Sequence, residues 1–405
     1  MRRVRVLVAL LVVVGAIASH GAPAASAVEW SGSPSVAAES ELVEPLAGLV
    51  TNGPVYDIER IGTTTYLGGD FDYIGERTGP VVSMVASTGE RTDVLPAINR
   101  SASGGRSLFT ALPDGDGGWY LAGGFALSGD SANIGVAHVD AAGQVLWSAP
   151  VSGRSNIVRN IEVQADVILV AGSFDSIGGE TRGGLAALDR TTGSVLPWTS
   201  ALAQPQGCGF EDATLANGVV YVVGNECGII SRAVLRAVNY PSGTVRPFDP
   251  LNPGFFEPPQ YNVEYFDGLV MTNSHTFDEF SLPQVAPCPI GNHSTRVADV
   301  VYAATETGVV GCDLATGEHV IELPGNRDSA VSADDARVYT ATNGRLNAYD
   351  RDTSELVWST QTNGSFGNPG RALVIAVSGA NVVAADASAS SMDVQPRGGL
   401  AALDG

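Results

Sequence analysis

Residues 161–198 carry the clearest pattern of apolar and polar positions in the chain, IEVQADVILVAGSFDSIGGETRGGLAALDRTTGSVLPW. Short apolar runs alternate with turns rich in Gly, Asp and Thr, which is typical of β-strands joined by tight turns. Versions of this pattern recur along the rest of the chain, and each predicts four short strands. We therefore expect an all-β protein built from repeated four-stranded units.

The spacing of the repeats indicates a β-propeller. One turn residue precedes the predicted fourth strand of successive repeats, at Gly89, Gly143, Gly193, Gly243, Gly317 and Ser354. The steps between these markers are 54, 50, 50, 74 and 37 residues. A period of about 40–50 residues with four strands is the signature of propeller blades. The long step predicts an insertion at about 255–293 in the fifth unit, or an extra blade hidden there.

The two ends of the repeat array predict how the ring closes. Residues 397–404, RGGLAALD, are identical to residues 182–189 and supply the third strand of the last unit. Residues 40–46, SELVEPL, resemble the fourth strand that begins at residue 354, SELVW. If residues 40–46 complete the C-terminal blade, two exposed sheet edges are covered. We expect a seven-bladed propeller of four-stranded blades closed by this N-terminal strand, or eight blades if the insertion is itself a blade.

Aromatic and acidic residues recur at fixed positions of the repeat. Trp147, Trp198, Phe248 and Trp358 occupy one position in the fourth strand, and Asp140, Asp189, Asp313, Asp350 and Asp404 end the third strand. A sugar-binding platform or a calcium site is conceivable for such residues. Their repetition favours structural roles, because every blade must bury the same face and make the same turn. We expect the aromatic rings to pack between blades and the carboxylates to bind turn N–H groups.

The N-terminus of the 405-residue chain has the pattern of an export signal. Three Arg among the first five residues precede an apolar run over 6–18, and Ala25-Ser26-Ala27 fits a cleavage site. The run is shorter than the roughly 20 residues that span a membrane. We expect a signal peptide at 1–27, a flexible tether at 28–39 and the propeller at 40–405. The mature protein would be secreted, extracellular or in the cell envelope, without a membrane span.

The charge of the chain limits the classes of partner, and its four cysteines predict disulfides. The formal net charge is −21 and no Lys occurs, which argues against nucleic-acid binding and against a catalytic Lys. We expect a monomer whose partner is a protein or a glycan at the cell surface. Cys208 and Cys227 are equidistant from the hairpin turn Asn217-Gly218, which predicts a disulfide between them. Cys288 and Cys312 then pair by elimination, or remain buried free thiols.

Several repeats also carry motifs of known propeller families. These are LGGDF at 67–71, AGGF at 122–125, AGSF at 171–174 and the RGGLAALD octapeptide. They resemble the delta-60-repeat β-propellers of secreted bacterial proteins. Later units such as residues 338–346 resemble the PQQ-type quinoprotein repeat. The resemblance implies a propeller fold. It implies no cofactor, because the adjacent cysteines of a PQQ alcohol dehydrogenase are absent.

No motif of a known reaction is present, so we assign no catalytic, cofactor-binding or metal-binding residue. A ligand site must break the symmetry of the repeats, and the unrepeated polar residues Glu257, Glu264, Asn273 and His275 are therefore candidates for ligand binding. Our hypothesis is a non-enzymatic binding or protein-interaction module at or outside the cell envelope. The alternative is an enzyme with its site in the central channel, a hydrolase, lyase or quinoprotein-like protein.

Overall fold

The computed structural model describes eighteen stretches of the chain, all within the compact unit Leu46–Gly405. They are residues 49–51, 55–61, 64–69, 73–76, 81–92, 95, 98–100, 108–127, 134–202, 207–226, 232–251, 260–279, 283–284, 286–342, 344–361, 373–386, 395–396 and 400–404. All regular structure in these stretches is β-strand. The predicted signal peptide, the tether and residues 40–46 lie outside the described residues.

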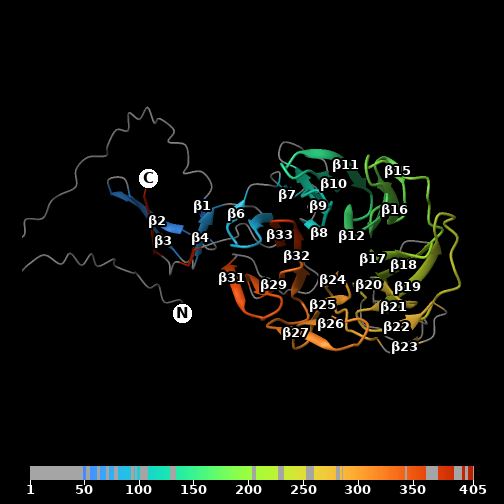
Figure 1. The fold of residues 1–405 in the computed structure, drawn as a ribbon. Helices are drawn as coiled ribbons and strands as arrows, with labels where there is room; N and C mark the ends of the chain where they lie inside the picture. Colours follow the sequence, from blue (N-terminus) through green and yellow to red (C-terminus); the bar gives the residue numbers. More distant parts are fainter. Residues whose placement is uncertain are drawn as a thin grey trace, which may run out of the picture. The chain divides into compact units, whose positions relative to one another are not determined.

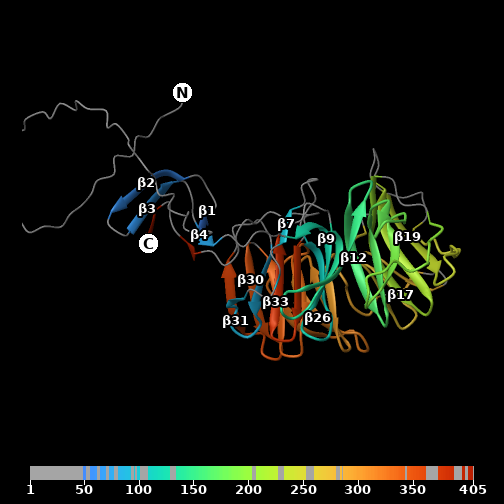
Figure 2. The same cartoon turned by 90° about the horizontal axis from the view of Figure 1, so that it is seen from above.

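Seven antiparallel sheets form a propeller ring (Figure 1), which Figure 2 shows turned by 90°. Blade 1 holds β8 (Leu108–Pro113), β9 (Trp119–Leu127), β10 (Ile134–Val139) and β11 (Val145–Ser152). Blade 2 holds β12 (Ile157–Gln164), β13 (Val167–Ser173) and β16 (Leu185–Asp189), and blade 3 holds β17 (Gly207–Ala216), β18 (Val219–Glu226) and β19 (Arg232–Asn239). In blades 2 and 3 the fourth strand is reduced to single bridges, Leu188–Val195 and Val238–Val245.

The other four blades have four strands each. Blade 4 holds β20 (Val263–Phe266), β21 (Leu269–Thr272), β22 (Thr276–Asp278) and β23 (Pro283–Gln284). Blade 5 holds β24 (Ser294–Val297), β25 (Val300–Thr305), β26 (Gly308–Asp313) and β27 (His319–Leu323). Blade 6 holds β28 (Ala330–Ala333), β29 (Arg337–Thr342), β30 (Arg345–Asp350) and β31 (Leu356–Gln361). Blade 7 holds β32 (Leu373–Ser378), β33 (Asn381–Asp386), β5 (Val81–Val85) and β6 (Arg91–Thr92).

The remaining strands extend blade 1 or form two small sheets. In blade 1, β7 (Ile98–Arg100) pairs with the end of β9, and the hairpin β14 (Ser176–Ile177) and β15 (Glu180–Thr181) is added to β11. One small sheet is β1 (Leu49–Thr51), β4 (Tyr73–Glu76) and β34 (Gln395–Pro396). The other is β2 (Val55–Ile61), β3 (Thr64–Gly69) and β35 (Leu400–Asp404).

The seven-bladed fold is confirmed, but the chain ends combine differently from the expectation. The third strand of the C-terminal blade is β5 of the first repeat, followed by β6, whereas β35, which was expected there, pairs with β3 of the first repeat. Four of the five residues of β5 are apolar, and Val81, Val82 and Met84 are buried in the cores on the two faces of blade 7. N-terminal residues therefore close the ring, while the predicted role of residues 40–46, which lie outside the described residues, stays a prediction.

The region predicted as an insertion, 255–293, contains the four strands of blade 4. These strands are two to four residues long and are interrupted by Pro and Gly, so their alternating pattern is weak in the sequence. The ring nevertheless has seven blades, because the first repeat gives β5 and β6 to blade 7 instead of forming a ring blade of its own.

Neighbouring blades are joined by the repeated aromatic residues. The indole of Trp147 in blade 1 lies against Gly193 in a turn of blade 2, and that of Trp358 in blade 6 lies against Gly89 in blade 7. The Trp358 Nε1–H donates to the carbonyl of Ala86 at 2.9 Å. The predicted packing between blades is therefore what the repeated aromatic position does.

The repeated aspartates hold the turns between third and fourth strands, as predicted. Asp140 Oδ1 accepts from the backbone N–H groups of Ala142 and Gln144. In the turns of Asp189, Asp313 and Asp350, the Asp Oδ1 accepts hydrogen bonds from the backbone N–H and the hydroxyl of the Thr three residues on. These bonds hold the pKa of Asp189, Asp313 and Asp350 below its ordinary value. A carboxylate already bound to its own turn is a structural group.

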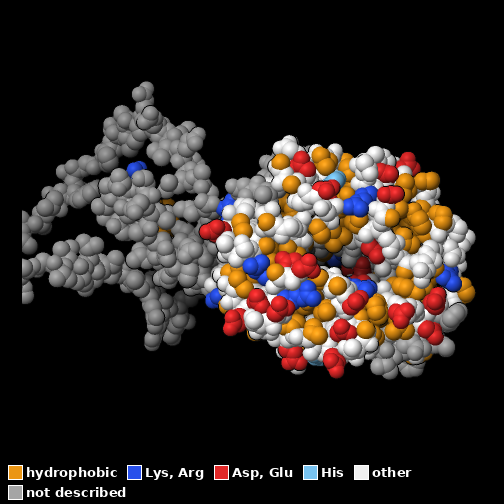
Figure 3. All heavy atoms as spheres, viewed as in Figure 1, with side chains coloured by type: hydrophobic (Ala, Val, Ile, Leu, Met, Phe, Trp, Pro, Cys, Tyr) orange, Lys and Arg blue, Asp and Glu red, His pale blue; other side chains and the backbone are white. Residues whose placement is uncertain are grey.

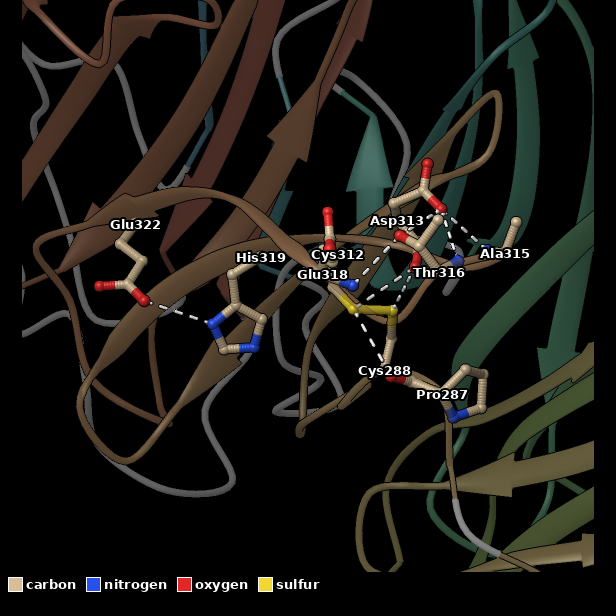
Figure 4. The surroundings of a disulfide bond; sticks show 9 residues. All are labelled: Pro287, Cys288, Cys312, Asp313, Ala315, Thr316, Glu318, His319 and Glu322. Atoms are coloured by element: carbon tan, nitrogen blue, oxygen red, sulfur yellow. Dashed lines mark hydrogen bonds and ion pairs between the residues drawn. A yellow bond between two sulfur atoms is a disulfide. The ribbon is translucent and has the colours of Figure 1, made fainter.

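A disulfide joins Cys288 and Cys312, which are both buried, with their Cα atoms 5.8 Å apart (Figure 4). It ties the segment before β24 to the third strand of blade 5. The predicted Cys208–Cys227 bond stays a prediction, because Cys227 lies outside the described residues. Strands β17 and β18 pair symmetrically about Asn217-Gly218, but one bulge between Phe210 and Asp212 shifts the pairing before it reaches Cys208, and a second lies at Cys208 itself, between Gly207 and Gly209.

The contact between Trp147 and Gly193 can be tested by substitution. Gly193 has φ +68°, and a Cβ there would overlap the Trp147 ring. For Gly193→Ala we expect the free energy of unfolding to fall by about 2–4 kcal/mol, because of backbone strain and overpacking. Calorimetry should show this as a fall of several degrees in Tm. Gly179→Ala is the control, because Gly179 has φ +84° and open space around its Cβ position. Equal losses in the two variants would contradict the blade contact.

Candidate functional site

The first strand of each blade lines the centre of the ring. These strands are β8, β12, β17, β20, β24, β28 and β32, and neighbouring strands from β24 through β28, β32, β8, β12 and β17 to β20 lie side by side. Figure 3 shows a hollow at the centre of the ring face, with acidic and basic side chains around it.

Three carboxylates on consecutive inner strands each contact the next blade. Glu162 on β12 accepts hydrogen bonds in blade 3, from the Leu215 N–H at 2.7 Å and from the Thr214 hydroxyl at 3.2 Å. Asp212 on β17 accepts one in blade 4, from the Val263 N–H at 2.8 Å. Glu264 on β20 accepts one in blade 5, from the hydroxyl of Ser294. We call Glu162, Asp212 and Glu264 the channel carboxylates.

Burial raises the pKa of each channel carboxylate to about 7. Desolvation of the charged form is the largest cause. Mutual repulsion adds to it, since Asp212 acts on Glu162, Glu162 on Glu264 and Glu264 on Asp212. The guanidinium of Arg296 on β24 opposes the rise for Glu264. The three groups therefore titrate as one coupled set near neutral pH.

A second group of charged and aromatic residues lies where the inner strands begin. Arg159 on β12 forms an ion pair with Glu211 on β17, with Nε and Oε2 3.5 Å apart, and its guanidinium lies 5.0 Å from the centre of the Phe109 ring. Tyr261, just before β20, is 38% exposed, and its backbone N–H donates to the Asn273 Oδ1 at 2.9 Å. We call Arg159, Glu211, Tyr261 and Asn273 the mouth residues.

The structure separates the residues that the sequence proposed for ligand binding. Glu264 belongs to the channel carboxylates, and Asn273 belongs to the mouth residues. His275 follows Asn273 in the turn between β21 and β22, where its backbone N–H donates to the Thr272 hydroxyl at 3.0 Å and its ring stacks on Phe277. Glu257 lies outside the described residues, so its proposed role remains untested.

Sequence reasoning missed Glu162, Asp212 and the Arg159–Glu211 ion pair. A signal for them exists, because they are charged residues within short predicted strands that also carry apolar residues. That they converge depends on the ring, which places β12, β17 and β20 side by side although residues 162 and 264 are far apart in the chain. Spacing along the sequence carries no such information.

The channel carboxylates could exchange protons near neutral pH, and the charged mouth residues could bind a charged or polar partner. Among the described residues no group of three or more His, Cys, Asp or Glu side chains is arranged to hold a metal ion. Asp212 uses both carboxylate oxygens for backbone N–H groups, of Val263 and of its neighbour Ala213. What remains is a set of carboxylates that gain or lose protons near pH 7, beneath a mouth with a guanidinium, a carboxylate and an exposed phenol ring.

The chain belongs to a family of PQQ-like repeat propellers. The family model described as "Outer membrane protein assembly factor BamB" matches residues 132–360, more than half of the chain. This supports the PQQ-type part of the expected resemblance, whereas the delta-60 part stays an expectation. A search of curated proteins finds no match. No helix that could cross a membrane occurs in the part of the chain that the structure describes.

Two solved structures are similar to this chain at low identity. The crystal structure of BamB from Moraxella catarrhalis has 13% sequence identity and a TM-score of 0.39, covering 84% of this chain and 99% of that one. The computationally designed Ika4 protein has 9% identity and a TM-score of 0.29, covering 44% of this chain and 89% of that one.

The raised pKa values predict a pH dependence of stability. Between about pH 4.5 and 7 the folded protein holds protons on the channel carboxylates that the unfolded chain has released, so the free energy of unfolding falls as pH rises through this window. We expect Tm to fall by several degrees from pH 5 to pH 8. Glu264→Gln should reduce this fall, because a neutral amide needs no proton.

The control is Glu355→Gln, which also removes one negative charge, but from an exposed turn. It should leave the pH dependence of Tm nearly unchanged. If Tm is independent of pH between 5 and 8, or if the two variants behave alike, the channel carboxylates do not titrate as described.

Proposed function

We propose that this protein is an exported, non-enzymatic protein-interaction module of the cell envelope, which binds a protein partner at the mouth residues. The observation that carries the proposal is the gathering of unrepeated Arg159, Glu211 and Tyr261 at one end of the central channel. Repeated residues hold the blades together. Tyr261 is the exposed member of this group, and the ion pair of Arg159 and Glu211 lies beside it, so the group can serve recognition.

The residue types at the mouth favour a protein partner. Tyr and Arg are enriched among the residues that dominate protein interfaces, since they combine a large apolar contact with a polar group. The guanidinium of Arg159 is already oriented by Glu211 and by the Phe109 ring, so little side-chain entropy remains to be lost on binding. The name of the family, an outer membrane assembly factor, agrees with a role in bringing proteins together.

Export rests on the sequence of the first 27 residues and on the envelope location in the family's name. A glycan is the other partner that the mouth could take, because an exposed aromatic ring such as Tyr261 can stack on a sugar. The experiment below distinguishes the two, since only a protein partner gives a protein adduct.

The proposal is tested by photo-crosslinking in the exporting cell. A photoreactive amino acid at Tyr261 should give one defined adduct with another envelope protein, identified by mass spectrometry. Arg159→Ala should reduce the yield of this adduct by about tenfold or more, as expected for an interface hot spot. The control position is Thr192, an exposed residue in a turn at the opposite end of the blades. An equal adduct from both positions, or none from Tyr261, would refute binding at the mouth.

An enzyme with its site in the channel is the second candidate. It is favoured by the pKa of about 7 of the channel carboxylates, a value suited to general acid–base catalysis. If envelope glycans or peptides are cleaved by the purified protein, Glu162→Gln should abolish the reaction while Tm at pH 5 is retained. Turnover unaffected by Glu162→Gln would exclude these carboxylates as the catalytic groups.

A further inference from the structure

The first and last repeats pair their third strands crosswise. In the blades between them, the third strand pairs with the second strand of the same repeat, as β16 pairs with β13. At the ends of the array, β33 of the last repeat pairs with β5 of the first, and β3 of the first repeat pairs with β35 of the last. The two repeats have exchanged equivalent strands.

The register of the two exchanged pairings is equivalent. Strand β5 lies on β33 from Asn381↔Val85 to Ala385↔Val81, and β35 lies on β3 from Thr64↔Asp404 to Gly68↔Leu400. In blade 2, β16 lies on β13 from Val167↔Asp189 to Ala171↔Leu185. Each is an antiparallel ladder of five residue pairs. The edges of β33 and β3 therefore pair with a third strand in the same register.

We propose that the edge of β33 accepts either β5 or β35, so that the protein has a second pairing in which the first and last repeats each keep their own third strand. The connections are long enough for this. Residues 70–80, which include β4, link β3 to β5, and residues 387–399, which include β34, link β33 to β35. Residues 174–184, which include β14 and β15, are of similar length and link β13 to β16, which pair locally. Strands β4 and β34 pair with each other in the structure.

The sequence of β35 suits the place that β5 occupies. In the structure Val82 and Met84 of β5 are buried in one core cluster with Val382 and Ala384. In the second pairing Leu403 takes the position of Met84, which nearly conserves volume, and Ala401 takes that of Val82, which is larger by two methyl groups. The same sequence, LAALD, is the third strand of blade 2, where Leu185 to Leu188 are at most 1% exposed. This ring therefore already buries that segment in that role.

Contacts with blade 6 favour the pairing seen in the structure. The Trp358 Nε1–H donates to the carbonyl of Ala86, directly after β5, and the Trp358 ring covers Gly89. The Ser83 hydroxyl also donates to the carbonyl oxygen of Thr92 at 2.7 Å, and this hydrogen bond holds β6 beside β5. The local pairing of β35 lacks the Trp358 contact. Weakening this contact should shift the population toward β35.

Engineered cysteine pairs test the exchange, with a short bifunctional thiol reagent and peptide mapping of the monomer. Ser83→Cys with Val383→Cys reports the pairing in the structure. Val383→Cys with Ala402→Cys reports the second pairing. We expect both pairs to cross-link within one chain. Adding Trp358→Phe should raise the ratio of the 383–402 to the 83–383 cross-link roughly fivefold, the effect of losing about one hydrogen bond.

Trp147→Phe is the matched control. The Trp147 indole of blade 1 covers Gly193 of blade 2, as Trp358 covers Gly89, but this contact lies away from the exchanged strands. This variant should leave the ratio unchanged. A third pair, Tyr66→Cys with Ala402→Cys, reports β3 with β35 and must decline as the 383–402 cross-link rises. The proposal is overturned if residues 383 and 402 never cross-link within a chain, even with Trp358→Phe, or if they cross-link while 83 and 383 do not.

Discussion

No blade of this protein can bury both of its faces by itself, and the rest of the structure follows from that constraint. Core clusters lie between neighbouring sheets, as in the cluster that joins blades 1 and 2. Near the outer strands, the indole of Trp147 in blade 1 likewise packs on Gly193 of blade 2. Every blade of a ring has both faces buried only when the first and last sheets also pack against each other. Closure is therefore an energetic requirement, and N-terminal β5 meets it by filling the core of blade 7.

The same dependence shapes the centre of the ring. Inner strands approach one another closely, so polar groups there must find partners in the next blade. Glu162 and Asp212 find them in backbone N–H groups, at the cost of desolvated carboxylates with pKa values near 7. Proton uptake and the cohesion of blades 2 to 5 are consequently linked. A partner that changes the electrostatics of the mouth, where Arg159 and Glu211 lie, would act on this linkage.

Much of the architecture could be predicted, and little of the site. Turn glycines, aromatic positions and the aspartates of the turns repeat, so their roles could be assigned from one repeat and extended to the others. The sequence predicts an insertion where blade 4 lies, because strands of two to four residues carry almost no alternation. Of the proposed ligand residues, Glu264 lies in the channel wall beside two carboxylates that no motif marked, and Asn273 supports Tyr261 at the mouth.

The sequence by itself determined the all-β class, the four-stranded repeat and the packing between blades, because these depend on periodicities that local sequence contains. Tertiary structure alone decided which strand completes which sheet and which polar residues meet in the channel. Strands β5 and β35 have similar lengths and apolar character, so the sequence does not distinguish which of them lies beside β33; in the structure it is β5, and the segment after it contacts Trp358. Glu162, Asp212 and Glu264 meet because ring closure sets inner strands side by side, whatever their separation in the chain.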